Sequence, residues 1–349
     1  VLKFHAANEA INLQRVALQL SSTASNSPQD LAQLSLWDGS TQVGTAIFTT
    51  GDYATSTLTS TVTIPKDGDK LITVKGNMAN IGTSQPGTQG HLVVVNYDGA
   101  DSTGTQGVGV SSGATRNQSS SSDTDSSGVR LFRSFPTVTK LSVPTTTLSN
   151  GTMSLLRFKV TADSAGDVGL YKFSFKVSTT TCTADSLNVY AYTDSGFSVP
   201  VSGIGAGGIM MNTDLDLETL WASSATQLEV FPQTTAAAST TIQVPAGATR
   251  YFDVIATMSG VATGDSISTQ LEGDAAYPLF NAMWSAVDSF MLTAMDVDSA
   301  TTTPTQSNDD FIWSPNATTT SLVTNVDWTN GYGVSGLPST NMSAEVLSR

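Results

Sequence analysis

One spacing of apolar residues occurs twice in this chain, first over residues 11–20 and again over residues 168–177. Within each copy apolar and polar residues alternate, which is typical of a strand with one buried face. A shorter segment of the same kind precedes each copy, at residues 2–4 and 156–158. A whole pattern repeated at this distance indicates that one folding unit has been duplicated.

Later segments repeat in the same order. Residues 34–37 correspond to residues 187–190. Farther along, Pro65 and Pro245 each end a short apolar run and precede a second run at the same offset. Proline cannot donate to a central ladder, so each marks a strand end. Asp-Gly and Asn-Gly turns separate the segments. The predicted fold class is all-β, with two tandem antiparallel β-sandwich domains of Ig-like or jelly-roll-like kind and an extended C-terminal tail.

Four parts are expected along the chain. The first β-sandwich domain covers residues 1–110, and its repeat covers residues 135–275. Between them, residues 111–134 are rich in Ser and Gly and are predicted to form a linker or a long loop. Residues 276–349 break the repeat and are predicted to be an irregular tail packed on a sandwich, with any helix confined to residues 280–291.

The chain is acidic and sparsely charged. It carries 15 basic and 29 acidic residues, so its net charge is −14. Nucleic-acid binding needs clustered Lys and Arg, so no nucleic-acid partner is expected. No apolar run of about 18 residues is present, so no membrane span is expected. The start at Val1 without an initiator Met is interpreted as a processed N-terminus, which places the protein outside the cell or on its surface.

Residues for catalysis are few. The chain has two histidines, His5 and His91, and one cysteine, Cys182. Both histidines lie in predicted strands, and no Gly-x-Ser-x-Gly elbow is present. A lone Cys in a β-rich stretch is more often a small buried hydrophobe than a nucleophile, and it cannot form an intrachain disulfide. We therefore expect a protein that is not an enzyme.

Calcium is the one cofactor that the acidic loops suggest, because this hard cation binds several oxygen ligands. None of the loops matches the twelve-residue loop with its glycine and terminal glutamate. The candidate ligands are Asp214, Asp216, Glu218, Asp296, Asp298, Asp309 and Asp310.

Asn-x-Ser/Thr sequons offer candidate glycosylation sites, although such triplets also arise by chance in a chain rich in Asn, Ser and Thr. They begin at Asn117, Asn150, Asn316 and Asn341.

The N-terminal segment has two interpretations. Val1, Leu2 and Phe4 belong to a short apolar stretch that is a candidate donor strand, adding to the sheet of a neighbouring copy. Alternatively, this stretch is the first strand of its own domain, as its match to residues 156–158 suggests. The sequence leaves both open.

Three stretches carry a resemblance to a known group. They are Phe132 to Val138, Arg157 to Ala162 followed by Gly166 to Val168, and the tail segments Phe311 to Pro315 and Asp327 to Gly333. On these the chain resembles secreted surface proteins with tandem β-sandwiches from candidate-phylum (Patescibacteria-like) bacteria. In composition it is also similar to surface-layer and filament subunits. The resemblance implies secretion and surface display and transfers no catalytic residue.

The leading functional hypothesis is a structural subunit of an extracellular assembly, such as a filament, pilus-like fibre or surface layer. Copies of the chain would associate through sandwich edges or terminal strands, so the expected partner is the chain itself. The alternative is a monomeric adhesin or carbohydrate-binding protein that recognises surface glycans. In that case Trp313, Trp328 and Tyr332 would form an aromatic platform, whereas packing of these rings on a sandwich is the competing interpretation.

Overall fold

The structure is a computed structural model, and it describes residues 1–22, 24, 26–49, 51–118, 122–210, 225–235, 238–274, 310–316, 328–337 and 341–349. The described chain is almost entirely strand and turn, with two short 3-10 helices at Pro28–Asp30 and Ala206–Gly208. The predicted all-β class is therefore confirmed. The chain forms two compact units, Val1–Phe132 (unit 1) and Arg133–Arg349 (unit 2).

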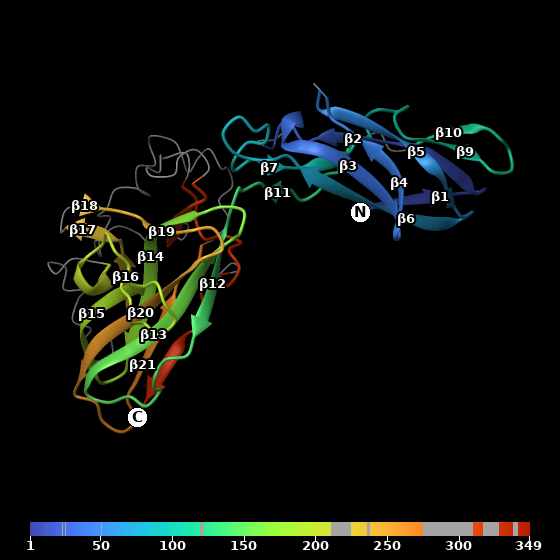
Figure 1. Ribbon diagram of the computed structural model, residues 1–349. Helices are drawn as coiled ribbons and strands as arrows, with labels where there is room; N and C mark the ends of the chain where they lie inside the picture. The colour runs from blue at the N-terminus through green and yellow to red at the C-terminus, as the bar shows by residue number, and fades with distance from the viewer. Residues whose placement is uncertain are drawn as a thin grey trace. The chain divides into compact units, whose positions relative to one another are not determined.

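Unit 1 contains one curled antiparallel sheet in the order β1-β6-β3-β4-β5-β2-β9-β10, with β8 also paired to β2 and a separate β7–β11 pair (Figure 1). Its strands are β1 (Leu2–Ala6), β2 (Ile11–Leu20), β3 (Leu31–Asp38), β4 (Thr41–Ala46), β5 (Tyr53–Ile64), β6 (Gly68–Met78), β7 (Leu92–Val93), β8 (Val95–Tyr97), β9 (Gln106–Gly109), β10 (Thr115–Asn117) and β11 (Val129–Arg130).

The sheet of unit 1 turns a corner between β4 and β5. The backbone ladder between these two strands consists of a single residue pair, Gly44 and Leu58. A Cβ on Gly44 would lie 2.6 Å from the Ser56 hydroxyl oxygen and 2.9 Å from a Leu58 methyl carbon, so a larger residue here would have to displace these two side chains. The fold at this corner brings the apolar faces together around fully buried residues such as Val16, Leu36 and Ile72.

Unit 2 is a sandwich of two antiparallel sheets. One sheet has the order β12-β13-β20-β15, and the other has the order β16-β14-β21-β23, with β19 and β22 also paired to β14. The strands are β12 (Pro136–Leu141), β13 (Gly151–Ala162), β14 (Val168–Thr179), β15 (Thr183–Tyr192), β16 (Ala225–Val230), β17 (Gln233–Thr235), β18 (Ala238–Ser239), β19 (Ile242–Val244), β20 (Thr249–Ser259), β21 (Ser266–Leu271), β22 (Phe311–Ser314) and β23 (Glu345–Ser348).

Phenylalanine rings join the two sheets of unit 2. Phe158 of β13 stacks on Phe252 of β20 with ring centroids 4.8 Å apart. Phe173 of β14, in the opposite sheet, lies 5.1 Å from Phe252 and 5.3 Å from Phe311. All four residues are fully buried, so their burial and ring contacts fix how the two sheets face one another.

The two units pair their strands in the same way. Ile11, Asn12 and Leu13 face Ile64, Thr63 and Val62, just as Val168, Gly169 and Leu170 face Val244, Gln243 and Ile242. On the opposite edge both central strands carry a register shift at the same point, between Leu13 and Arg15 and between Leu170 and Lys172. The equivalent strands are thus β1 and β13, β2 and β14, β3 and β15, β6 and β20, β8 and β21, and β9 and β22.

The alignment of the first strand differs from the sequence pattern by two residues. The sequence pattern matches Leu2 to Leu156. In the structure, Leu2 pairs with Ile72 of β6. The residue of unit 2 that is equivalent to Ile72 is Phe252, and Phe252 pairs with Phe158. Leu2 is therefore the structural equivalent of Phe158. Strands have a side-chain period of two, so a shift of two residues keeps the same side chains inward and leaves the pattern unchanged.

Two segments that the sequence describes as irregular contain strands. Within residues 111–134, β10 pairs with β9 and β11 pairs with β7, so this stretch belongs to unit 1 and the division between units falls after Phe132. Within residues 276–349, β22 pairs with β14 and β23 pairs with β21. Residues 280–291, where a helix was considered, lie outside the described chain.

Candidate functional site

In the described part of unit 1, β1 lies at the end of its sheet. Among the described residues, the backbone of β1 pairs with β6, and beyond that only Ala6 forms a single bridge with Lys66. In unit 2 the equivalent strand β13 is flanked on both sides, by β20 and by β12 (Figure 1). Unit 1 therefore presents a strand edge at the position where unit 2 has β12.

The candidate donor residues lie in this strand and belong to their own unit. Leu2 and Phe4 are half-buried and pack against the core, and the Phe4 ring meets Tyr97 edge-on at 6.0 Å between centroids. Val1 precedes the strand and is 82% exposed. In this single chain, residues 2–6 thus form the first strand of their own unit, which is the second of the two sequence interpretations.

The side chains of Lys3 and His5 lie on the outer face of β1 and not along its backbone edge. Lys3 Nζ and His5 Nδ1 each lie 2.8 Å from the Asp69 carboxylate on β6. These two bonds lower the pKa of Asp69, with the Lys3 bond contributing most. All three side chains are exposed, so the pairs contribute little to stability, but they hold the Lys3 and His5 side chains over β6.

Three strand edges of unit 2 are covered by other parts of the same chain. Val138 of β12 donates its N–H to the Ser335 carbonyl. Leu148 donates to the Ser348 carbonyl of β23. Along β15, Val201 and Met210 donate to the carbonyls of Ala191 and Val189. These hydrogen bonds satisfy some of the backbone groups along the three edges, as the bridge between Ala6 and Lys66 does at one end of β1.

Unit 2 also differs from unit 1 on both sides of β14. In unit 1 the segment paired along one side of β2 is a single strand, β5, whereas in unit 2 its counterpart is split into β16 and β19 with the β17–β18 pair between them. On the other side the connection after Tyr97 returns at Gln106 in unit 1, whereas the connection after Leu271 returns at Phe311 in unit 2. Both differences lie next to Phe173, which pairs with Val230 of β16 on one side and with Phe311 of β22 on the other.

A buried ion pair lies beside Phe173, between β14 and β16. Lys172 Nζ is 2.5 Å from Glu229 Oε1, and the two side chains are only 4% and 18% exposed. At the equivalent positions of unit 1, Arg15 is half-buried and Thr55 is exposed. Beside the pair, the Tyr171 ring contacts both Phe231 and Trp328, and Lys172 Nζ lies 5.8 Å from the Phe231 ring centroid.

Asp274 ties three chain segments together beside β14. Its side chain is fully buried and accepts hydrogen bonds from the backbone nitrogens of Asp310 at 2.7 Å, Phe311 at 3.1 Å and Gly331 at 2.6 Å. The carboxylate of Asp310 accepts a bond from the Gln227 amide at 2.7 Å. A carboxylate that receives several backbone N–H groups is an anchor for those segments.

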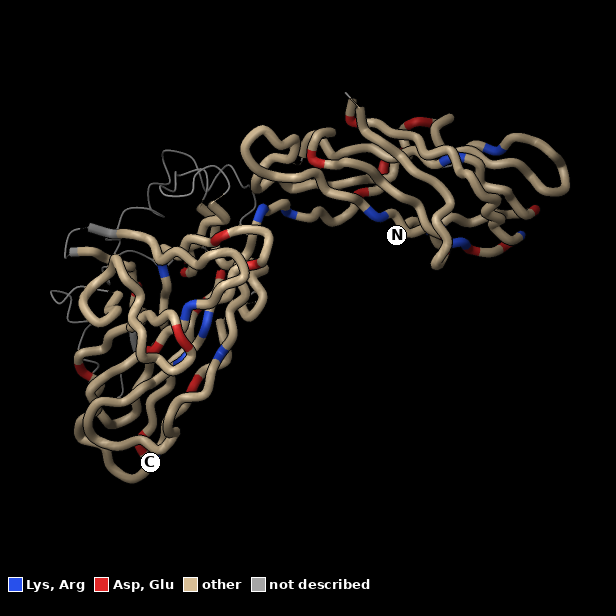
Figure 2. Tube along the Cα trace, viewed as in Figure 1, with Lys and Arg blue, Asp and Glu red and all other residues tan. Residues whose placement is uncertain are grey.

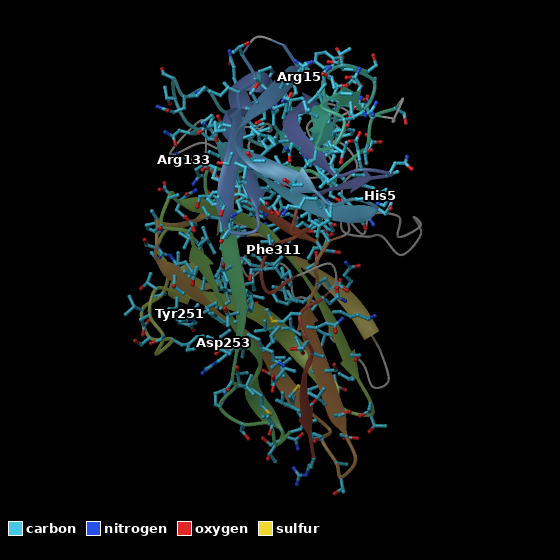
Figure 3. The ribbon with its side chains drawn as sticks, turned by 90° about the vertical axis from the view of Figure 1, so that its right-hand side faces the viewer. His5, Arg15, Arg133, Tyr251, Asp253 and Phe311 are labelled. Carbon is cyan, nitrogen blue, oxygen red and sulfur yellow. The ribbon has the colours of Figure 1, made fainter. Side chains whose placement is uncertain are left out.

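On the outer face of the other sheet, Arg157 of β13 binds Asp253 of β20 through two nitrogens, at 2.8 and 2.6 Å. Figure 3 labels Asp253 and its neighbour Tyr251 on β20. Phe197 has a φ of 55°, unusual for a bulky residue, and its ring lies 4.0 Å from the Arg157 guanidinium carbon. These contacts hold the 193–199 turn against the sheet.

Of the seven metal ligands predicted from the sequence, only Asp310 lies among the described residues. Asp214, Asp216, Glu218, Asp296, Asp298 and Asp309 lie outside the described residues, while Asp310 bonds Gln227 as above. In the described part of the chain, no three His, Cys, Asp or Glu residues gather as they would around a metal ion. Charged residues are sparse along both units (Figure 2).

The four sequons differ in exposure. Asn117 and Asn150 are exposed, Asn341 is half-buried, and Asn316 is 1% exposed with its side-chain nitrogen donating to Gln243 at 2.7 Å. The folded chain therefore presents no free amide for a glycan at Asn316.

The residues singled out for chemistry or for a glycan platform have structural partners. His91 Nδ1 lies 2.7 Å from the carboxylate of Asp30, which is fully buried. Cys182 is fully buried, and burial raises the pKa of its thiol. Trp313 and Trp328 are 2% and 4% exposed, whereas Tyr332 is 51% exposed. The two tryptophans thus pack inside unit 2.

No sequence motif singles out Asp274, Lys172 or Glu229. Isolated charged residues within apolar stretches were the available signal, because Lys172 stands between Tyr171 and Phe173, and Glu229 between Leu228 and Val230. A charge in such a place is either solvent-facing or paired, and the sequence does not distinguish these cases.

Comparison with known proteins gives no family. No family model matches the chain, and no curated protein matches it. Among solved structures, a chain described as BspA_C_WT has 10% identity and a TM-score of 0.21, covering 75% of this chain and 80% of its own length. A structure described as manganese lipoxygenase of Gaeumannomyces graminis and part of zonadhesin of Komagataella pastoris has 9% identity and a TM-score of 0.17, covering 78% and 79%. Neither similarity is strong enough to support an argument. No helix in the described residues is long and apolar enough to cross a membrane.

Proposed function

We propose that this chain is a structural subunit of an extracellular assembly and that copies associate through the β-sheet edge of unit 1. The observation that carries the proposal is the contrast between the two repeats. β13 is flanked by β12, whereas its equivalent β1 has an open edge along the described chain. An open edge presents unpaired backbone groups, which favour pairing with another strand.

The composition supports the same proposal. The chain is acidic, has few charged residues and carries a single cysteine, and in this it is similar to surface-layer and filament subunits. The assembly would be either a filament or a surface layer, depending on how the subunits repeat.

Negative-stain electron microscopy of the purified chain, with and without a calcium chelator, tests the proposal. Ordered filaments or sheets support it, and their loss on chelation would assign calcium a part in assembly. Dispersed single particles at every concentration, with or without chelator, contradict it and favour a monomeric adhesin.

A further inference from the structure

Asparagine is followed by glycine at two places in this chain, Asn150-Gly151 and Asn330-Gly331. Asparagine is a thermolabile residue, and it is most reactive before glycine, because no Cβ hinders the backbone nitrogen of the glycine. That nitrogen can attack the side-chain carbonyl carbon of the asparagine. The two steps have the same chemistry, so a difference in their reactivity comes from the fold.

The Asn150-Gly151 step is accessible. It lies at the start of β13, and both residues are exposed. Gly151 has a φ of 108°, which side chains disfavour, and a Cβ built on it would meet nothing within 4 Å. The Oδ1 atom of Asn150 accepts a hydrogen bond from the Val261 backbone nitrogen at 2.9 Å. A donor at this place stabilises the negative charge that Oδ1 gains when Cγ is attacked.

The Asn330-Gly331 step is closed. Asn330 is 5% exposed, and the Gly331 N–H donates to the buried carboxylate of Asp274 at 2.6 Å. The Oδ1 atom of Asn330 also has a donor, the Tyr332 backbone nitrogen at 3.2 Å. The two steps are therefore alike at the attacked carbonyl and differ at the attacking nitrogen. Ring closure at Asn330 requires that the segment first open locally.

We infer that Asn150 is a site of spontaneous deamidation in the folded chain and that the fold protects Asn330. The Gly151 nitrogen forms a bond to Cγ of Asn150, the bond from Cγ to Nδ2 breaks, and Nδ2 leaves as ammonia with the proton of the Gly151 N–H. Water then opens the cyclic imide at either carbonyl, which gives aspartate or isoaspartate. The net reaction consumes one water molecule and releases one ammonia molecule.

The product alters this part of unit 2. Aspartate or isoaspartate adds a negative charge to an acidic chain and removes the sequon, so a deamidated chain can no longer be glycosylated at position 150. Isoaspartate also inserts a backbone methylene just before β13, where Gly151 pairs with Met258 of β20. The reaction is independent of self-association.

Incubation of the intact chain in mildly alkaline water labelled with heavy oxygen measures both steps at once. Digestion with pepsin in acid, where deamidation is slow, and mass spectrometry of the peptides give the labelled product at each position. In the folded chain, Asn150 is expected to react at least about tenfold faster than Asn330, which reacts only in locally opened molecules. In guanidinium chloride the two rates are expected to converge, because the fold no longer distinguishes the steps.

Two variants serve as controls. Asn150→Gln is expected to abolish the labelled product at position 150 and to leave Asn330 unchanged, because the longer side chain closes a ring much more slowly. Asp274→Asn weakens the hold on the Gly331 N–H and is expected to raise the rate at Asn330 several-fold.

The outcomes decide both parts of the inference. Labelled product at Asn150 in the folded chain, with much less at Asn330, supports it. Equal rates at the two positions in the folded chain overturn the protection of Asn330. Absence of labelled product at Asn150 over a time in which the denatured chain reacts overturns the assignment of Asn150 as the reactive site.

Discussion

The carboxylate of Asp274 accepts a hydrogen bond of 2.6 Å from the backbone nitrogen of Gly331, although the two residues are 57 positions apart. The same side chain also accepts the backbone N–H groups of Asp310 and Phe311 at the start of β22. One fully buried side chain therefore holds the end of β21, the start of β22 and the segment around Gly331 in place.

Replacing Asp274 by Asn should destabilise unit 2 by about 2–3 kcal/mol, because the amide nitrogen cannot accept and leaves buried N–H groups unpaired. Chemical denaturation monitored by tryptophan fluorescence measures this loss. Asp52→Asn, at an exposed position in unit 1, is the control and should change stability by less than about 0.5 kcal/mol. Equal stability of the Asp274 and Asp52 variants would show that the anchor is dispensable.

The hydrogen bond from Gly331 to Asp274 also requires that residue 331 have no side chain. A Cβ at this position would lie 2.9 Å from both Asp274 Oδ2 and Phe311 Cβ. Gly331→Ala should therefore cost about 1–3 kcal/mol through overpacking. Gly51→Ala is the control, because nothing lies within 4 Å of its added Cβ. The thermal midpoints of the two variants give the comparison, and a stable Gly331→Ala chain would contradict the packing described here.

The buried Lys172–Glu229 pair should behave asymmetrically on mutation. Glu229→Gln leaves a buried ammonium without its counter-charge and is expected to cost about 3 kcal/mol. Lys172→Met combined with Glu229→Leu removes both charges and is expected to recover most of that loss. Urea denaturation of Lys172→Met, of Glu229→Leu and of the double variant completes the cycle. Additive losses in the double variant would mean that the two groups are not coupled.

Glu9 should titrate far below an ordinary glutamate. Hydrogen bonds from Ser112 and Arg116, with a further backbone bond from Ser111, lower its pKa to about 2. A lowered carboxyl pKa means that the contact with the 111–116 turn is present above the ordinary pKa of 4.5 and is lost as the pH falls through about 2. Backbone amide NMR shifts of Ser111 and Ser112 should follow this midpoint. Glu9→Gln should abolish the titration, and a midpoint near 4.5 would contradict these contacts.

The internal repeat allowed the equivalent segments of the two units to be matched before the strand pairing was known. Matching Leu36 with Val189 and Val74 with Val254 from the pattern alone agrees with the ladders, where Leu36 faces Val74 and Val189 faces Val254. Such agreement is expected because the alternation of apolar residues records which face is buried.

Contacts that depend on distant segments could not be anticipated. β22 pairs with β14 although Leu170 and Trp313 are far apart in sequence, and no local pattern specifies that partner. The burial of Lys172 likewise depends on its surroundings, because its counterpart Arg15 in unit 1 is only half-buried, so periodicity alone does not indicate it. The open edge of β1 became visible only by comparison with β12 on β13.

Sedimentation velocity of the intact chain tests self-association most directly. The series should run from about 1 to about 200 µM, the range in which small interfaces form. The assembly proposal predicts a weight-average sedimentation coefficient that rises with concentration. A coefficient that stays at the monomer value throughout would contradict the assembly proposal.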